Sequence, residues 1–398
     1  MTFDTATPST RRSSAGRLRI GFIPLVDCAP LIVARELGFA ADEGLELDLV
    51  REVSWANIRD RILLGHFDAA HMLAPMPIAA RLGLGHVRVP IIAPFVLNQG
   101  GNSIAATTAL YAEGGDWGGF GDPLASGRAL ARLLEARRAG GAEQPTFASV
   151  HPFSCHHYQL RHWMAAAGID PDRDLRLVVV PPPHMVAAME AGDVDGVCVG
   201  APWTSRAVDA GVGRLLLPTA ALWPSAPEKV LGVREDFAER RGEELAALLR
   251  ALDRAAAWAE EPENRPRLAE IMARDDVIGV PAAAVMRTLS GNLLVEKGAA
   301  PVPVPGFLRF HGEGETGPIN RPRATDGLWF AAQMLRWRQT SDAETAFAAA
   351  REAFAPTWWD AALDRPSREA ATLRTFEGAV FDGGDPERWL AGAGPSFA

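Results

Sequence analysis

The sequence contains one short pattern twice: Leu64-Gly65-His66-Phe67-Asp68-Ala69 and Ala191-Gly192-Asp193-Val194-Asp195-Gly196. Each copy follows a segment with helical apolar spacing and precedes an apolar run, which predicts a helix, a glycine stop, a short turn and a buried strand. A unit of this kind that occurs twice predicts two similar α/β lobes. Two lobes enclose a cleft, and a cleft is the usual place for a small ligand.

The composition is that of an ordinary globular protein. The 398 residues are 48% hydrophobic and 22% charged, which is enough for two cores, because single cores rarely exceed about 250–300 residues. The net charge of −9, without a long basic run, argues against direct nucleic-acid binding. No apolar run approaches the roughly 20 residues of a membrane span, so we predict no membrane partner. The cysteines Cys28, Cys155 and Cys198 lack metal-binding spacing and are expected to be buried thiols.

The N-terminal region has some features of an export signal. Arg11-Arg12, the apolar stretch 20–26 and Cys28 could together form a signal with a lipidation cysteine. However, the stretch is short for a signal core and contains a glycine and a proline, and Asp27 stands where a small neutral residue is expected. We therefore predict a cytoplasmic chain that is not exported, with residues 1–16 disordered.

Helix and strand patterns alternate along the chain. Strands are predicted at 18–23, 45–51, 69–73, 88–97, 146–150, 175–180 and 196–199, and helices at 30–41, 57–64, 123–138, 155–167 and 184–191. Residues 100–121 are rich in glycine, threonine and alanine and are expected to form a loop and crossover. This order predicts an α/β fold with mostly parallel sheets flanked by helices.

The predicted strands divide the chain into two lobes. We assign residues 17–103 and 230–398 to lobe 1 and residues 104–229 to lobe 2, with a strand at 230–234 crossing back. Two crossings of this kind form a hinge. Beyond residue 236 the pattern is helical and predicts a C-terminal extension on lobe 1. Residues 300–323, with five prolines and four glycines, are expected to be an extended loop.

Enzyme motifs are missing from the sequence. There is no GxSxG, no GxxxxGK[ST] and no HExxH, and the GxGxxG match at 312–317 is followed by prolines where a helix should start. We therefore predict a protein that is not an enzyme and has no cofactor. His151, His156, His157 and His162 do not share one helical face and include no carboxylate, so no metal site is predicted. An enzyme of the same fold stays open as an alternative, with Cys155 beside His156 as its one candidate pair.

Four polar residues stand near strand ends or helix starts, where open α/β sheets gather their ligand-facing groups. They are Trp55, Gln99, His156 and Lys229. Indole, amide and imidazole N–H groups donate hydrogen bonds, and an ammonium group adds a positive charge, which suits a small oxyanion. For each residue taken alone, packing or a solvated surface position is the plain alternative.

Several stretches resemble the nitrate-binding proteins of ABC importers. They are residues 21–31, 54–55, 68–77, 98–100, 180–186, 198–203 and 227–229. The resemblance runs from about residue 17 to about residue 378. It implies a two-lobed, type II periplasmic-binding-protein-like fold that closes on nitrate or, in a sister branch, on bicarbonate.

The resemblance also implies site residues and a ligand. Trp55, Gln99, His156 and Lys229 correspond to the anion-contacting positions, and the bicarbonate branch replaces the lysine by an acid and the histidine by a hydroxyl residue. Because this chain keeps both, the resemblance points to nitrate or nitrite. A pocket that contains only donors would leave the O–H of bicarbonate unpaired, at a cost of about 1–3 kcal/mol.

Two departures from the importer pattern affect the expected function. Ala201 stands before the Pro-Trp pair, where importer-type members commonly have glutamate, and no export signal is predicted. The chain therefore resembles more closely a cytoplasmic nitrate/nitrite sensor branch. Such sensors hold an ANTAR-type RNA-binding antiterminator and release it when the anion binds. The sensor is the leading prediction, and the solute-binding component of a nitrate ABC importer is the alternative.

Overall fold

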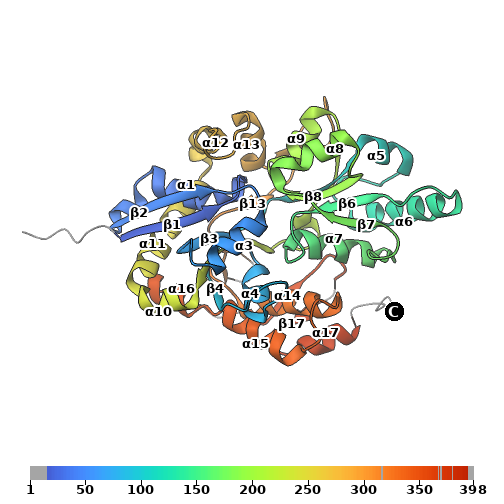
Figure 1. The fold of residues 1–398 in the computed structure, drawn as a ribbon. Coiled ribbons are helices and arrows are strands. Elements are labelled where there is room, and N and C mark those ends of the chain that lie inside the picture. Colours follow the sequence, from blue (N-terminus) through green and yellow to red (C-terminus); the bar gives the residue numbers. More distant parts are fainter. Residues whose placement is uncertain (1–15, 315–316, 366, 368–369, 379, 393–398) are drawn as a thin grey trace, which may run out of the picture.

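The computed structural model describes residues 16–314, 317–365, 367, 370–378 and 380–392. Within these residues, a six-stranded sheet and a five-stranded sheet lie side by side, each covered by helices (Figure 1). The predicted α/β fold with two lobes is confirmed. Residues 1–16 were predicted to be disordered. Of these, residues 1–15 lie outside the described residues, and Gly16 begins the first strand.

The six-stranded sheet forms lobe 1, with the order β13-β4-β10-β3-β1-β2. Its strands are β1 (Gly16–Phe22), β2 (Leu45–Arg51), β3 (Ala69–Leu73), β4 (Ile91–Gly100), β10 (Pro227–Arg234) and β13 (Leu308–Arg309). The five-stranded sheet forms lobe 2, with the order β7-β6-β8-β5-β9. Its strands are β5 (Asn102–Thr107), β6 (Thr146–Ser149), β7 (Arg176–Val179), β8 (Gly196–Gly200) and β9 (Gly213–Pro218).

Helices flank both sheets (Figure 1). Lobe 1 has η1 (Val26–Cys28), α1 (Ala29–Glu36), α2 (Phe39–Asp42), α3 (Trp55–Leu63) and α4 (Met76–Leu82). Lobe 2 has α5 (Thr108–Gly114), α6 (Pro123–Ala139), α7 (Cys155–Ala166), η2 (Pro182–His184), α8 (Met185–Ala191), α9 (Trp203–Ala210) and η3 (Thr219–Ala221).

The C-terminal part is largely helical. Its helices are α10 (Glu235–Arg240), α11 (Gly242–Glu260), η4 (Pro262–Asn264), α12 (Arg265–Ala273), α13 (Ala282–Ser290), α14 (Ala324–Arg336), α15 (Ala343–Ala353), α16 (Thr357–Leu363) and α17 (Pro386–Gly392). Short hairpins join β11 (Asn292–Leu293) to β12 (Val302–Pro303), β14 (Glu313–Gly314) to β15 (Gly317–Pro318), and β16 (Thr372–Arg374) to β17 (Val380–Asp382). None of the helices in the described ranges is long and apolar enough to cross a membrane.

The repeated pattern has the same structural role in each lobe. The amide of Asp68 donates to the carbonyl of Arg19 at 2.8 Å, and the Asp68 carboxylate accepts from the Arg19 amide at 2.8 Å. In lobe 2, the amide of Asp195 donates to the carbonyl of Thr146 at 2.7 Å, and its carboxylate accepts from the Thr146 amide at 2.8 Å. Each aspartate thus ties the start of its own strand to the parallel strand beside it, which is why the sequence carries the pattern twice.

Both sheets are mixed rather than mostly parallel. Strand β10 runs antiparallel to β3 and β4, and β5 runs antiparallel to β8 and β9. The prediction of a loop at residues 100–121 is wrong for residues 102–114, which form β5 and α5. The residues of β5 are mostly small, and half of them are polar. Five of the six are nevertheless buried, because distant strands pair with β5 on both sides. Residues 300–323, expected as an extended loop, contribute β13 to the edge of the first sheet.

The chain changes sheet at two places. It leaves the first sheet at Gly100 and enters the second at Asn102, and it returns between Pro218 and Pro227. Gly100 has a φ of 69°, and a Cβ there would lie 2.4 Å from the carbonyl oxygen of Phe307, so the first crossing requires glycine. The predicted lobe boundaries themselves stay a prediction.

The C-terminal extension packs on lobe 1 and also reaches lobe 2. In Figure 1, α15 and α14 lie below α4, and α14 extends toward α7. The guanidinium of Arg336 on α14 donates to His162 Nδ1 on α7 at 3.0 Å. On the other side of the ring, His162 Nε2 lies 2.9 Å from the Glu377 carboxylate. The extension therefore joins the two lobes as well as covering lobe 1.

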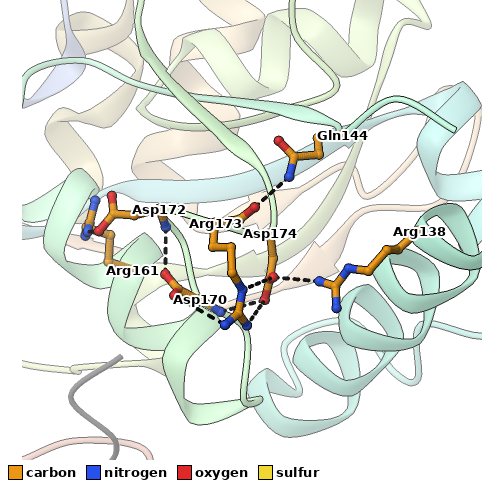
Figure 2. A network of polar contacts seen from close by, with 7 residues as sticks. All are labelled: Arg138, Gln144, Arg161, Asp170, Asp172, Arg173 and Asp174. Carbon is orange, nitrogen blue, oxygen red and sulfur yellow. Dashed lines mark hydrogen bonds and ion pairs between the residues drawn. The ribbon is translucent and has the colours of Figure 1, made fainter. Parts of the chain in front are cut away.

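A polar network fixes the segment that follows α7. Figure 2 shows the carboxylate of Asp174 between Arg138 and Arg173, at 2.6 Å and 3.0 Å. The same carboxylate accepts from the amide of Asp170 at 2.9 Å. The arginines are largely exposed, so each ion pair contributes little by itself, but the shared aspartate orders the turn between α7 and β7.

Candidate functional site

A fully buried lysine lies where the two lobes meet. Lys229 is on β10, the strand that crosses back from lobe 2, and its Nζ is 2.9 Å from Oδ2 of Asp27 in η1. Both side chains are buried, with 0% and 2% exposed. Of the 40 basic residues in the chain only two are lysines, Lys229 and Lys297, so the one buried ammonium group stands out in a chain that otherwise uses arginine.

His71 holds the other side of the Asp27 carboxylate. Its Nε2 lies 3.1 Å from Asp27 Oδ1, and its Nδ1 accepts a hydrogen bond from the amide of Ile23 at 3.4 Å. This arrangement assigns the ring proton to Nε2, facing Asp27. Burial lowers the pKa of His71 below its ordinary value, so at neutral pH the ring is an uncharged donor.

The Asp27–Lys229 pair stays ionised at neutral pH. Burial by itself raises the pKa of Asp27, but the charge of Lys229 and the contact with His71 lower it to about 2. Burial by itself lowers the pKa of Lys229, but the charge of Asp27 raises it above its ordinary value. The two charges therefore persist in the interior because each compensates the other.

Trp55 adjoins this pair through His71. It is the first residue of α3, where the hydroxyl of Ser54 accepts from the amide of Asn57 at 3.2 Å and caps the helix. The Trp55 ring meets the His71 ring edge-on, with 5.1 Å between centroids. Its Nε1 is buried without a hydrogen-bond partner. An indole N–H of this kind is available to a ligand.

His156 approaches from lobe 2. It lies in the first turn of α7, which Ser154 caps by accepting from the amide of His157 at 3.0 Å. The imidazole is fully buried, and neither ring nitrogen has a hydrogen-bond partner. Burial and then the charge of Lys229 hold the pKa of His156 well below its ordinary value. A neutral ring with one unpaired N–H thus lies within the electrostatic reach of Lys229.

Of the four predicted residues, Trp55, His156 and Lys229 lie around Asp27, whereas the side chain of Gln99 lies elsewhere. Gln99 lies on β4 opposite Pro227, and its Oε1 is 3.8 Å from the position that a Cβ on Gly314 would take. Its side chain therefore lies against the β14–β15 hairpin. The neighbouring Asn98 is the residue opposite Lys229 in the register, and its Oδ1 is buried without a partner.

Lobe 2 closes over Asp27. A Cβ on Gly200, at the end of β8, would lie 3.6 Å from Asp27 Oδ2. Beside it, the amide of Val26 donates to the carbonyl of Ala201 at 3.0 Å, and Trp203 Nε1 donates to the carbonyl of Pro24 at 3.1 Å. The Asp27–Lys229 pair is thus enclosed by both lobes.

A second buried acid stands beside Lys229. Glu228 accepts hydrogen bonds from Gln159 Nε2 on α7, at 3.0 Å, and from Asn102 Nδ2 on β5. Because neighbours on a strand point to opposite faces, Glu228 lies on the face of β10 away from Lys229. Burial raises the pKa of Glu228 to about 7.

The central residues of the site, Asp27 and His71, were not among the predicted site residues. Asp27 lies in η1, within the turn that follows the first strand, a position that favours ligand contacts, but its charge was considered only as a mismatch to an export signal. His71 interrupts the apolar strand β3, which is the signal that could have identified it. The expectation of a pocket with donors only is wrong, because the carboxylate of Asp27 is an acceptor at its centre.

The residues considered for nucleophilic or metal chemistry have the following surroundings in the described structure. Cys28, Cys155 and Cys198 are buried free thiols. The thiol of Cys155 donates to the carbonyl of Pro227 at 3.2 Å, and burial raises its pKa well above the ordinary value, so it is no activated nucleophile. No group of three or more histidine, cysteine or acidic residues in the described ranges is arranged to hold a metal ion.

The fold and the enclosed polar site define a two-lobed binding protein with a periplasmic-binding-protein fold. A model of the NMT1-like family matches residues 12–273, and the chain belongs to that family. The nitrate/nitrite binding protein NrtA of Synechococcus elongatus is 31% identical, over 98% of this chain and 90% of its own length. The crystal structure of the periplasmic nitrate-binding protein NrtA from Synechocystis PCC 6803 superimposes with a TM-score of 0.86, at 26% identity, over 96% of this chain and 99% of that chain.

Another relative is much longer than this chain and matches it over only part of its own length. The bicarbonate transport ATP-binding protein CmpC of Synechococcus elongatus is 37% identical over 80% of this chain, but the match covers 45% of CmpC. The chain therefore spans less than half the length of this relative. The two NrtA proteins, which match over nearly their whole length, are binding proteins by name. This agrees with the prediction that the chain is not an enzyme.

The raised pKa of Glu228 predicts a pH-dependent contribution to stability. The folded protein binds this proton more tightly than the unfolded chain, whose pKa is near the ordinary 4.5. The contribution of Glu228 to the free energy of unfolding therefore falls as pH rises from about 4.5 to about 7. Relative to the native protein, Glu228→Gln should gain roughly 1–3 kcal/mol in unfolding free energy between pH 5 and pH 8.

Chemical denaturation at several pH values measures this difference. Glu263→Gln, at an exposed position, is the control and should follow the native protein at every pH. Parallel pH profiles for Glu228→Gln and the native protein would contradict the assignment.

Proposed function

We propose that this chain is the solute-binding component of an ABC importer and that it binds nitrate or nitrite between its lobes. The observation that carries the proposal is the fully buried Lys229 ammonium, with the unpaired N–H of His156 within its electrostatic reach and that of Trp55 joined to it through His71 and Asp27. An unpaired buried donor is costly, and a ligand oxygen removes that cost.

The chemistry of these groups matches a small oxyanion. Nitrate and nitrite only accept hydrogen bonds, and Trp55, His156 and Lys229 can all donate. Trp55 and His156 also lie in the first turns of α3 and α7, where helix dipoles favour negative charge. An ammonium group has three N–H bonds, so Lys229 can keep its contact with Asp27 and still bind an anion.

The comparisons support the importer over the predicted sensor. NrtA is named as a nitrate/nitrite binding protein and, in the crystal structure, as periplasmic. None of the relatives described above is named as a sensor or as a partner of an antiterminator. The sensor role, the ANTAR-type partner and the cytoplasmic location stay predictions, and the importer reading instead places the protein outside the cytoplasmic membrane.

Replacing the buried ammonium tests the proposed ligand. Lys229→Met keeps the length of the side chain and removes its charge, so affinity for nitrate should fall by about 100-fold or more. Lys297→Met, at the only other lysine, changes the net charge equally on the surface and should bind as the native protein does. Isothermal titration calorimetry of folded variants measures both. Native affinity in Lys229→Met would refute the site.

The indole N–H of Trp55 provides an independent test. Trp55→Phe keeps an aromatic ring against His71 and removes one donor to a charged ligand, so nitrate affinity should fall by about 10-fold. Trp359→Phe on α16 also removes a buried indole N–H without a partner, but it lies in the C-terminal extension. Equal effects of the two substitutions on nitrate binding would show that Trp55 does not contact the ligand.

Uptake measurements separate import from sensing. Cells whose copy of the protein carries Lys229→Met should take up ¹⁵N-nitrate more slowly at low external concentration, and high concentrations should reduce the difference. If uptake is unchanged while the induction of nitrate-assimilation genes is altered, the sensor is supported instead.

A further inference from the structure

We propose that Asp27 sets the charge selectivity of this site: by cancelling the charge of Lys229, it restricts binding to monovalent oxyanions. The inference rests on the proposed function and adds the property that separates accepted from rejected anions. A donor set of lysine, tryptophan and histidine suits sulfate or hydrogen phosphate as well as nitrate, because all of them accept hydrogen bonds. Selectivity therefore needs a further element.

The geometry gives Asp27 that role. Its Oδ2 is 2.9 Å from Lys229 Nζ, its Oδ1 is 3.1 Å from His71 Nε2, and Gly200 closes the space beside it. The carboxylate is thus fixed on both oxygens at the junction of the lobes. An anion that contacts the Lys229 ammonium therefore lies close to a negative charge that cannot move away.

Among the residues that the structure describes, the groups that act on Lys229 supply no second positive charge. His71 and His156 are neutral at pH 7, because burial lowers the pKa of each ring. The charges that act on Lys229 come first from Asp27 and then from Glu228, and both are acids. The empty site is therefore neutral or slightly negative.

This balance affects monovalent and divalent ions differently. A monovalent anion brings the site to about one uncompensated negative charge, and a divalent anion to about two. The cost of a buried charge rises with the square of that charge, so the divalent ion is rejected much more strongly. The rejection is by charge and does not depend on the shape of the ion.

The test compares Asp27→Asn with the native protein by isothermal titration calorimetry. The amide keeps the size of the side chain and removes the negative charge beside the ligand. A bound anion then keeps Lys229 charged in place of Asp27, so nitrate should bind roughly 10- to 100-fold more tightly. Sulfate binding should appear in the variant. Asp193→Asn, at an exposed position, makes the same change in net charge and should leave nitrate affinity unchanged.

The nitrate affinity of Asp27→Asn is the deciding result. If Asp27 served only to hold Lys229 in place, the variant would bind nitrate more weakly, so an unchanged or lower affinity overturns the inference. Should Asp27→Asn not fold, the native protein decides the question. Perchlorate and sulfate have the same tetrahedral shape and differ in charge, and native protein that binds sulfate as tightly as perchlorate or nitrate overturns the inference.

Failure of the proposed function has a different signature. Native protein that binds neither nitrate nor nitrite refutes the function itself. Native protein that binds nitrate, together with an Asp27→Asn variant that binds it no better, refutes only the role of Asp27.

Discussion

The buried ion pair between Asp27 and Lys229 joins the turn after the first strand to the strand that returns from lobe 2. Moving two charges out of water is costly, and the attraction between them offsets this cost only when they are close and further hydrogen bonded. Here the distance is 2.9 Å, and His71 binds the free carboxylate oxygen. Apolar residues that fill such a space are often equally stable, so the presence of the pair is consistent with the anion binding proposed above.

The two lobes are built so that they meet at this pair. Asp27 follows the first strand of lobe 1, Lys229 lies on the strand that returns from lobe 2, and His156 begins a helix of lobe 2. The repeated aspartates tie the strands of each lobe, and the C-terminal extension joins the lobes through His162. This arrangement leaves the N–H groups of Trp55 and His156 unpaired at the junction of the lobes, where open α/β sheets gather ligand-facing groups.

Much of this arrangement could be predicted from the sequence. The repeated pattern predicts two α/β lobes. Trp55 and His156 stand at helix starts and Lys229 stands near the start of a strand, and the fold brings these positions to one place. Strand β5 could not be predicted, because its small residues become a strand only through pairing with distant strands. The orientation of Gln99 depends on register, since a shift of one residue turns a side chain to the other face of the sheet.

Asp27 and His71 were not predicted as site residues, because their contacts are with residues far apart in the sequence. The partners of Asp27 are His71 on β3 and Lys229 on β10, and no local pattern announces that three such residues will share one buried space. The net charge of the site could not be predicted from local sequence patterns either. Hydrogen-bond donors can be recognised from residue types, but only the fold determines whether an acid lies close enough to compensate the charge of Lys229.

The most direct measurement of the central claim is NMR of protein labelled with ¹⁵N in the lysine side chains. The chain has two lysines, so the spectrum should contain two ammonium signals, one from buried Lys229 and one from exposed Lys297. Nitrate is expected to shift the Lys229 signal to saturation and to leave that of Lys297 in place. Nitrate binding that is detected by calorimetry but leaves the Lys229 signal unmoved would contradict the central claim.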